Sequence, residues 1–183
     1  MIKFKDKSEE TVLPAIPNEL AIKCKKLLST LQSKNKRAIL KLKDIYKYLE
    51  DYGDFVKTFS VCSKGCSHCC KIDVTITELE AKLIEEETRR KRKPRQLIAS
   101  TGHTSPCPFL GDEGECTIYE VRPFHCRTFH TLDNPKYCET GEDHKIYGSF
   151  NGIYTVTIYE KLNQMRQHLN GKGAIMDIRD FFN

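Results

Sequence analysis

Cysteine is the residue type whose spacing in this sequence points most directly to chemistry. Four of the nine cysteines fall within nine residues, in the stretch Cys62-Ser63-Lys64-Gly65-Cys66-Ser67-His68-Cys69-Cys70. Four more follow later in the chain, at Cys107, Cys116, Cys126 and Cys138. A thiolate is a soft ligand that suits zinc and iron–sulfur clusters. Closely spaced thiols in one loop can converge on one ion, so we interpret the stretch 62–70 as half of a metal site and the later cysteines as its other half.

The spacing leaves the number of metal sites open. Eight thiols in two groups of four suit one four-iron cluster with spare thiols, or two tetrahedral sites of zinc or iron–sulfur type. The side chains of adjacent residues point apart in extended backbone, so Cys69 and Cys70 serve different sites or only one of them is a ligand. Gly65 permits a turn with positive φ, in which backbone N–H groups face a thiolate. A disulfide switch is the alternative to metal ligation.

Basic side chains near the cysteines are candidates to support such a site. His68 lies inside the first cluster and could ligate the metal or donate to a sulfur. Arg122 and Arg127 stand beside Cys126 and would offset negative charge on thiolates, with helix capping or a surface ion pair as the alternative. His125 and His130 are expected beside the ligands or at the surface. The remaining three histidines are expected in solvent: His103, His144 and His168.

Two ordered patterns together resemble a known family. The first cluster has C-x3-C-x2-C-C spacing, and the segment 107–127 reads C-P-F-L-x5-C-x-I-Y-x2-R-P-x2-C-R. These residues resemble the YkgJ cysteine-cluster family, also called the CxxCxxCC or zinc- or iron-chelating domain, over about residues 62–138. The resemblance implies a metal-binding protein, with Cys138 as the looser match because of its distance from Cys126. The ligands that it implies are Cys62, Cys66, Cys69, Cys70, Cys107, Cys116 and Cys126.

The resemblance also leaves an enzymatic alternative. A flagellin lysine methylase carries a related cysteine pattern, so a cluster-dependent protein-modifying activity is the second hypothesis. The sequence shows no serine, cysteine or carboxylate catalytic arrangement in a recognisable order. Our first hypothesis is therefore a protein that holds a zinc or iron–sulfur centre in a structural or redox role.

Composition favours a cytoplasmic protein in a reducing compartment. The chain has 183 residues, of which 39 % are hydrophobic and 30 % charged, so it can fold without disulfides. An odd count of nine cysteines argues against a disulfide framework. Residues 1–10 lack the apolar core of a secretory signal, and no run is long enough to span a membrane. Clustered cysteines in such a protein are usually metal ligands or redox groups.

One local excess of charge bears on partners. The net charge is +5, and residues 89–95 read Arg-Arg-Lys-Arg-Lys-Pro-Arg. We interpret this basic run as a solvated helix end, because cations stabilise the negative pole of a helix dipole. The alternative is contact with nucleic acid in a metal-stapled interaction module. The expected partners are a metal ion or cluster and an unidentified protein, with no membrane.

The predicted fold is mainly α, a helical domain with an irregular cysteine-rich centre and a short β-hairpin. Apolar periodicity predicts helices over 18–34, 37–59, 78–92 and 151–169. Asn18 and Thr77 are predicted N-caps, with Glu80 completing a capping box, and Gly171 ends the last long helix. Short strands are expected near 107–119, and a short docked helix near 175–182.

The three parts of the chain are expected to form one compact domain. They are an N-terminal helical part (1–61), the cysteine-cluster region (62–138) and a C-terminal helical part (139–183). Cys24 lies on the apolar stripe of the first helix, with Leu20, Leu27, Leu28 and Leu31. A free cysteine is among the most buried residue types, so Cys24 is expected in the core and not among the ligands.

Overall fold

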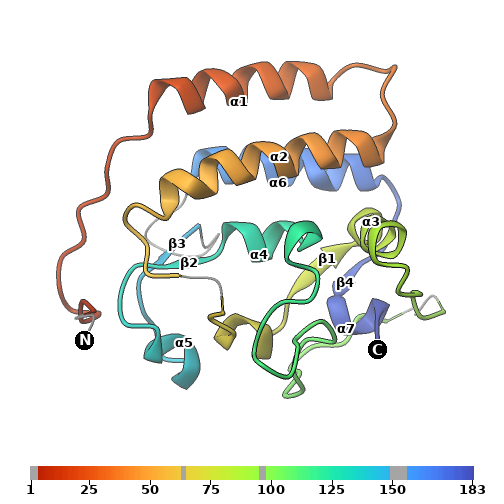
Figure 1. Cartoon of the computed structure of the whole chain (residues 1–183). Coiled ribbons are helices and arrows are strands. Elements are labelled where there is room, and N and C mark those ends of the chain that lie inside the picture. The colour runs from red at the N-terminus through yellow and green to blue at the C-terminus, as the bar shows by residue number, and fades with distance from the viewer. Residues whose placement is uncertain (1–3, 63–64, 95–97, 149–155) are drawn as a thin grey trace.

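The computed structural model describes residues 4–62, 65–94, 98–148 and 156–183, and the fold is mainly α, as predicted. Three long helices, α1 (Asn18–Leu31), α2 (Ala38–Val56) and α6 (Thr157–Asn170), lie side by side (Figure 1). A shorter helix, α3 (Glu78–Thr88), packs against α2 and α6. Most of the cysteine-bearing loops and short helices lie on the side of α2 and α6 away from α1 (Figure 1).

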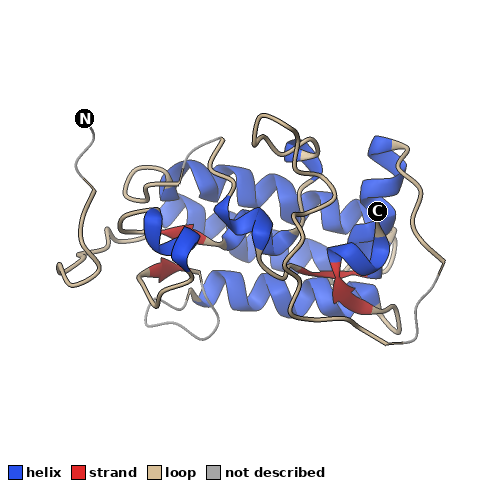
Figure 2. Cartoon of the chain, turned by 90° about the horizontal axis from the view of Figure 1, so that it is seen from below, coloured by secondary structure: helices blue, strands red, loops and turns tan. Residues whose placement is uncertain are grey.

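The remaining elements are short and irregularly connected. They are η1 (His68–Lys71), β1 (Thr75–Thr77), η2 (Tyr119–Val121), α4 (Phe124–Thr128), β2 (His130–Thr131), α5 (Lys136–Thr140), β3 (Ile146–Tyr147), β4 (Ile175–Asp177) and α7 (Ile178–Phe181). Two antiparallel pairs hold them together: β1 with β4, and β2 with β3 (Figure 2). Thr75 pairs with Asp177 in the first, so the end of the chain lies beside the residues that follow the first cysteine cluster.

Most of the predicted helices are confirmed, with shifted ends. Asn18 is not a cap, because Pro17 occupies the cap position and no side-chain hydrogen bond forms there. Helix α3 ends at Thr88, four residues early, because Arg89 is left-handed with φ 61°. Gly171 ends α6 with φ 59°, as predicted. The predicted start of this helix at 151 falls on residues 149–155, which lie outside the described residues.

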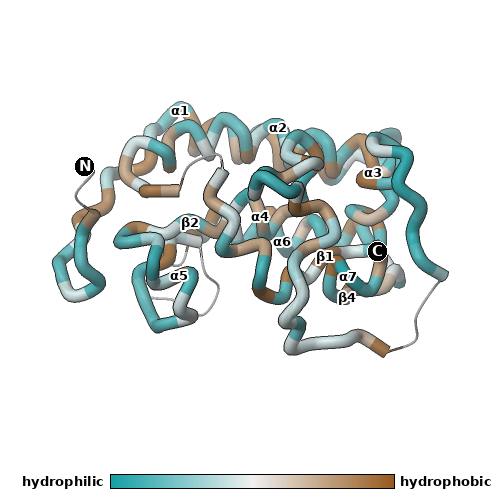
Figure 3. The backbone as a smooth tube through the Cα atoms, turned by 60° about the horizontal axis from the view of Figure 1, so that its bottom comes forward, coloured by the Kyte–Doolittle hydropathy of each residue, from teal (hydrophilic) through white to brown (hydrophobic). Residues whose placement is uncertain are grey.

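Two hydrophobic cores account for the arrangement. The first lies between the long helices, where apolar and polar residues alternate along α1 and α2 (Figure 3). It includes Cys24, which is 4 % exposed, so the core prediction for this cysteine is confirmed. The second core lies under the cysteine region and includes Ile76, Phe109 and Phe182. Cys107, among others, packs against this second core, which therefore supports the thiol-bearing loops.

The basic run 89–95 is partly tied to the fold. Arg92 donates to Glu85 at 2.9 Å, and Lys93 donates to the carbonyl oxygen of Arg179 at 2.8 Å. Arg95 lies outside the described residues. The contacts agree with the interpretation of a helix end whose cations pair locally.

A buried carboxylate joins four helices to one another. Glu80 is fully buried and accepts hydrogen bonds from the Tyr46 hydroxyl and the Phe124 N–H, both at 2.8 Å. Its other oxygen pairs with the Arg166 guanidinium at 2.5 Å. These donors come from α2, α4 and α6, whereas Glu80 lies in α3. The first residue of α4, the helix that carries Cys126, is therefore held by this one side chain.

Replacing Thr77 with alanine is expected to destabilise the protein by about 1–2 kcal/mol. Thr77 is fully buried and accepts the Glu80 N–H, while the Glu80 carboxylate accepts the Thr77 N–H, which confirms the capping box. Urea unfolding followed by circular dichroism measures the change. Thr30→Ala, at an exposed threonine of α1, is the control and should stay within about 0.5 kcal/mol of wild type. Equal effects of the two substitutions would contradict the role of the cap.

Candidate metal centre

The two cysteine clusters face each other across one cavity. Its volume is about 700 Å³, and seven cysteines line it: Cys62, Cys66, Cys69, Cys70, Cys107, Cys116 and Cys126. The backbone N–H of Cys107 donates to the carbonyl oxygen of Cys70 at 2.7 Å, which joins the two segments directly. All eight predicted ligands are partly exposed, in contrast to Cys24. A partly exposed thiol that faces a cavity remains accessible to a metal.

A hairpin positions two of these thiols. The Gly111 N–H donates to the Glu115 carbonyl at 2.8 Å, and Leu110 forms a β-bridge with Cys116. The predicted turn between Cys107 and Cys116 is therefore confirmed, and it places both cysteines on the same wall of the cavity.

Backbone donors face the sulfurs of the hairpin. Hydrogen bonds from the Phe109 and Ile118 backbones lower the pKa of Cys107 and Cys116, although burial outweighs them and leaves both values raised, that of Cys107 to about 11. Each donor lies two residues after its cysteine. N–H groups directed at sulfur stabilise a thiolate, so this wall is suited to a negatively charged centre.

Four thiols form one electrostatic group. Loss of hydration is the largest cause of the raised pKa of Cys126, and interactions with Cys107, Cys116 and Cys70 raise this pKa further. The pKa of Cys70 is raised first by a hydrogen bond with Cys69 and then by burial. Thiols that raise one another's pKa lie close together, and a metal ion would relieve their mutual repulsion as thiolates.

A second group lies at the other end of the first cluster. Burial raises the pKa of Cys62 to about 11, and interactions with Cys66 and Cys138 add to the increase. The Thr131 N–H donates to the Cys62 sulfur at 3.2 Å. Cys138 does not line the cavity described above and lies in α5, which packs against η1. The structure thus places Cys138 with the first cluster, and not with Cys126, the cysteine that precedes it in the sequence.

His144 was expected in solvent, and this prediction is wrong. Its Nδ1 lies 2.8 Å from a carboxylate oxygen of the fully buried Asp133, and its Nε2 lies 3.5 Å from the Cys138 sulfur. A carboxylate that holds one imidazole nitrogen orients the other toward a metal or thiol. The expectation for His103 is also wrong, because it is hydrogen-bonded to Asp73, whereas the side chain of His168 is exposed as predicted.

The two histidines flanking Cys126 are held by the fold. His125 and His130 both line the cavity, and burial lowers the pKa of each to about 4. His130 Nε2 lies 3.0 Å from the Arg127 carbonyl oxygen. Both imidazoles are therefore neutral at pH 7 and add no charge to the cavity.

The two predicted arginines have different roles. Arg127 donates to the Arg122 carbonyl, stacks 4.4 Å over the Tyr46 ring and pairs with Glu50, so it mainly holds the backbone around the cavity. Arg122 lines the cavity and lowers the pKa of Cys126. Its buried Nε has no hydrogen-bond partner among the residues that the structure describes, and the same holds for His68 Nδ1. Unpaired buried nitrogens are costly, so the Nε of Arg122 suits a negatively charged group in the cavity that it lines, whereas His68 is not among the lining residues.

The sulfurs are too widely spaced for one zinc ion as they stand. In the described parts of the chain, no three thiol sulfurs lie within 4.8 Å of one another, whereas Asp73, His103 and Asp177 do present such a trio of ligand atoms. Tetrahedral zinc with Zn–S bonds of about 2.3 Å needs sulfurs about 3.8 Å apart. The thiols are thus ligands of the type that a soft metal binds, but their sulfurs lie farther apart than in the coordination shell of a single ion.

No helix in the described ranges combines the length and the apolar character required to cross a bilayer.

Comparison with known proteins identifies the cysteine region. The model of the CxxCxxCC family, described as a "Putative zinc- or iron-chelating domain", matches residues 61–147. A search of curated proteins and a search of solved structures found no match. The matched residues contain all eight predicted ligands and His144. Residues 61–147 therefore match the model of the CxxCxxCC family of zinc- or iron-chelating domains, and this match supports metal binding by the cysteine region.

Proposed function

We propose that this protein carries an iron–sulfur centre with a redox role, held in the thiol-lined cavity. The ligands that we assign to this centre are Cys70, Cys107, Cys116 and Cys126. The observation that carries the proposal is the spacing of thiols around a cavity of about 700 Å³, which is far larger than one ion. A polynuclear cluster binds each thiolate through a different iron and so accommodates a wider spacing than zinc.

The charges around the cavity support the same centre. A cluster with four thiolates is an anion, and N–H groups and cations near its sulfurs tune its reduction potential. The backbones of Phe109 and Ile118 supply such donors. Arg122 lines the cavity, and its buried Nε has no hydrogen-bond partner among the described residues. When bound, a cluster of this kind accepts and donates single electrons.

A second metal centre is assigned to the remaining thiols. Cys62, Cys66 and Cys138 interact electrostatically with one another and lack a fourth thiol in the group. Two side chains are candidates for the fourth ligand: Cys69, in the η1 helix that packs against α5, and His144, next to Cys138. Asp133 would orient His144 for this purpose, as carboxylates do for metal-bound histidines.

A cluster-dependent protein-modifying enzyme is the second candidate function. The observation that favours it is again the cavity, since about 300–1,000 Å³ is the usual volume of pockets that bind small molecules. A cluster would fill only part of it. Binding of a small cosubstrate by the loaded protein, measured by calorimetry, would separate an enzyme from a simple electron carrier.

Anaerobic purification followed by metal, sulfide and absorption measurements tests the proposed function. We expect iron and acid-labile sulfide in equal amounts, with a visible absorption band that bleaches on reduction with dithionite. Zinc in whole-number stoichiometry, without iron or sulfide, would contradict the iron–sulfur assignment while leaving metal binding intact. His144→Ala and Cys69→Ser, compared by metal content, identify the fourth ligand of the second centre.

Removing the metal is expected to disorder the cysteine region while most of the helical content remains. Metal binding couples to folding when the unfolded chain offers no preformed site. Here the long helices supply most of the first hydrophobic core, whereas the elements within residues 62–138 are short, apart from α3. After chelation, far-ultraviolet circular dichroism should change little, and amide exchange should accelerate within 62–138. Cooperative loss of α1 and α2 on chelation is the result that would count against this.

A further inference from the structure

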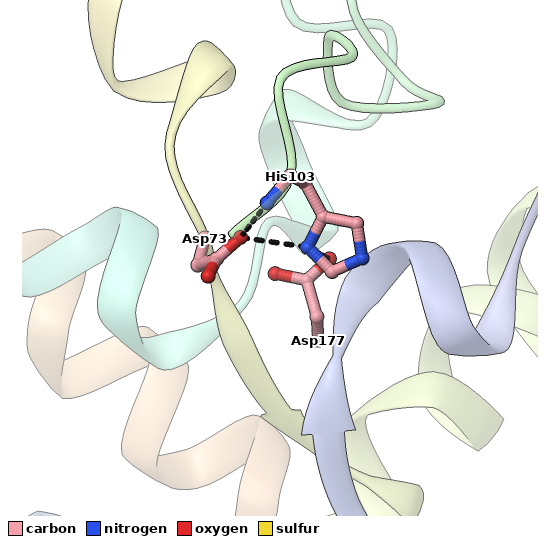
Figure 4. Close-up of side chains that lie close together, drawn as sticks. All are labelled: Asp73, His103 and Asp177. Carbon is pink, nitrogen blue, oxygen red and sulfur yellow. Dashed lines mark hydrogen bonds and ion pairs between the residues drawn. The ribbon is translucent and has the colours of Figure 1, made fainter. Parts of the chain in front are cut away.

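A second kind of donor cluster lies at the edge of the thiol cavity. Asp73 precedes β1, Asp177 ends β4, and His103 reaches between them from the loop that precedes Cys107 (Figure 4). His103 Nδ1 lies 2.6 Å from Asp73 Oδ1 and 3.7 Å from Asp177 Oδ1. The three ligand atoms all lie within 4.8 Å of one another. The pairing of β1 with β4 therefore brings two carboxylates to one imidazole nitrogen.

The hydrogen bonds of the imidazole show that this nitrogen faces a site for positive charge. His103 Nε2 lies 2.8 Å from the Ser100 hydroxyl oxygen. The single proton of that hydroxyl is directed to the Asp180 carboxylate, so Nε2 must be the donor to Ser100. A neutral ring with its proton on Nε2 would turn a bare Nδ1 lone pair toward Asp73. The space between Nδ1 and the two carboxylates thus requires a cation, either a proton or a metal ion.

Both carboxylates are held in place from outside the cluster. The Gly102 N–H donates to Asp73 Oδ2 at 2.7 Å, and the Val74 N–H donates to Asp177 Oδ2 at 2.6 Å. Hydrogen bonds from the Gly102 and His103 backbones lower the pKa of Asp73 to about 2, so its carboxylate is ionised at pH 7. Each carboxylate is oriented by a backbone amide, as in a preorganised ligand set.

The local charge matches a divalent ion. Asp73, Asp177 and Asp180 contribute three negative charges, and Arg179, which donates to Asp177 at 3.0 Å, contributes one positive charge. With a neutral His103 the cluster has an excess of two negative charges. Arg179 also donates to the Cys70 carbonyl at 3.2 Å, which links the cluster to the backbone of the thiol loop.

We propose that Asp73, His103 and Asp177 form a divalent-cation site, separate from the thiolate ligands, that takes Mn²⁺ or Fe²⁺. Two carboxylates and one imidazole supply oxygen and nitrogen ligands. Mn²⁺ and Fe²⁺ bind such ligands, and Mn²⁺ prefers them to thiolates. His103 ligates through Nδ1, while Ser100 and Asp180 orient the ring through Nε2, as polar partners do for most metal-bound histidines. Three protein ligands leave positions for water or substrate. Asp73 also lines the thiol cavity, so a ligand in that cavity can contact the ion.

Titration of the anaerobically purified protein with Mn²⁺, followed by the electron paramagnetic resonance signal of the free ion, tests this site. We expect one Mn²⁺ to bind per chain. His103→Ala and Asp73→Asn should weaken binding by about 100-fold or more, and Ser100→Ala by about 10- to 100-fold through loss of ring orientation. His168→Ala, at an exposed histidine of α6, is the matched control and should bind as wild type does.

Metal and sulfide content in the same samples separates this site from the thiol centre. All four variants should retain the wild-type content at the cysteines, since none of them replaces a thiol. Circular dichroism melting confirms that each variant is folded, and Ser100→Ala, at an exposed position, provides the mildest change. Failure of the folded wild-type protein to bind Mn²⁺ would overturn the proposal and assign the positive charge to a proton on His103. Wild-type Mn²⁺ affinity in His103→Ala would overturn it as well.

Discussion

Replacing Cys126 with serine is expected to reduce the metal content of the thiol cavity to below about a tenth of wild type, because a neutral hydroxyl is a poor ligand for soft metals. Cys126 interacts with Cys70, Cys107 and Cys116, and all three raise the pKa of its thiol. Loss of this member should therefore prevent a complete shell. Metal and sulfide analysis of the protein purified without oxygen measures the effect.

Cys24→Ser is the matched control for this substitution. Cys24 is buried in the core between the long helices, and the same atomic change there should leave the metal content unchanged. Its cost should be about 1–3 kcal/mol of stability, for burying a hydroxyl in place of a thiol. Cys138→Ser should reduce the metal only at the second centre. If Cys24→Ser removed the metal while Cys126→Ser retained it, the assignment of the site would be wrong.

Replacing Glu80 with alanine is expected to destabilise the protein by about 3–5 kcal/mol. Glu80 and Arg166 are almost completely buried, and removing the carboxylate leaves a guanidinium without its counter-charge. The Phe124 N–H and the Tyr46 hydroxyl lose their acceptor in the same step. Urea unfolding should show the loss. Since Phe124 begins the helix that carries Cys126, metal retention should also weaken.

Glu86→Ala is the control for this prediction. Glu86 is exposed on the same helix, and its replacement should change the free energy of unfolding by less than about 0.5 kcal/mol. A similar small change for Glu80→Ala would show that Arg166 finds another partner and that the network is not essential.

The same carboxylate predicts a pH dependence. Burial alone would raise the pKa of Glu80, but the Arg166 charge and the hydrogen-bond donors outweigh it and hold the value below the ordinary 4.5. A carboxyl with a lowered pKa in the native state stabilises the protein above its unfolded pKa and loses that contribution as the pH falls. Wild-type stability should therefore fall more steeply below about pH 5 than that of Glu80→Ala. Parallel curves for the two proteins in urea titrations would be inconsistent with this assignment.

Local sequence determined those features that depend on neighbouring residues. The capping box needs only Thr77 and Glu80, three positions apart, and the hairpin needs only the turn residues between Cys107 and Cys116. Cys24 was predictable as a core residue because it shares a helix face with leucines. The four cysteines of 62–70 were predictable as one cluster, because thiols so close in sequence stay near one another whatever the rest of the fold does. The N-cap at Asn18 failed even locally, since Pro17 took the cap position.

Only the tertiary structure decided which side chains meet across the chain. The grouping of Cys138 with Cys62, the His144–Asp133 pair and the buried Glu80–Arg166 pair all join residues that no local spacing connects. The cluster of Asp73, His103 and Asp177 exists because β1 pairs with β4, about a hundred residues later in the chain. Periodicity and motif spacing report which face a residue occupies within its own element. Which elements pack against each other is set by the burial of whole apolar faces, and that packing placed the charged side chains of this site.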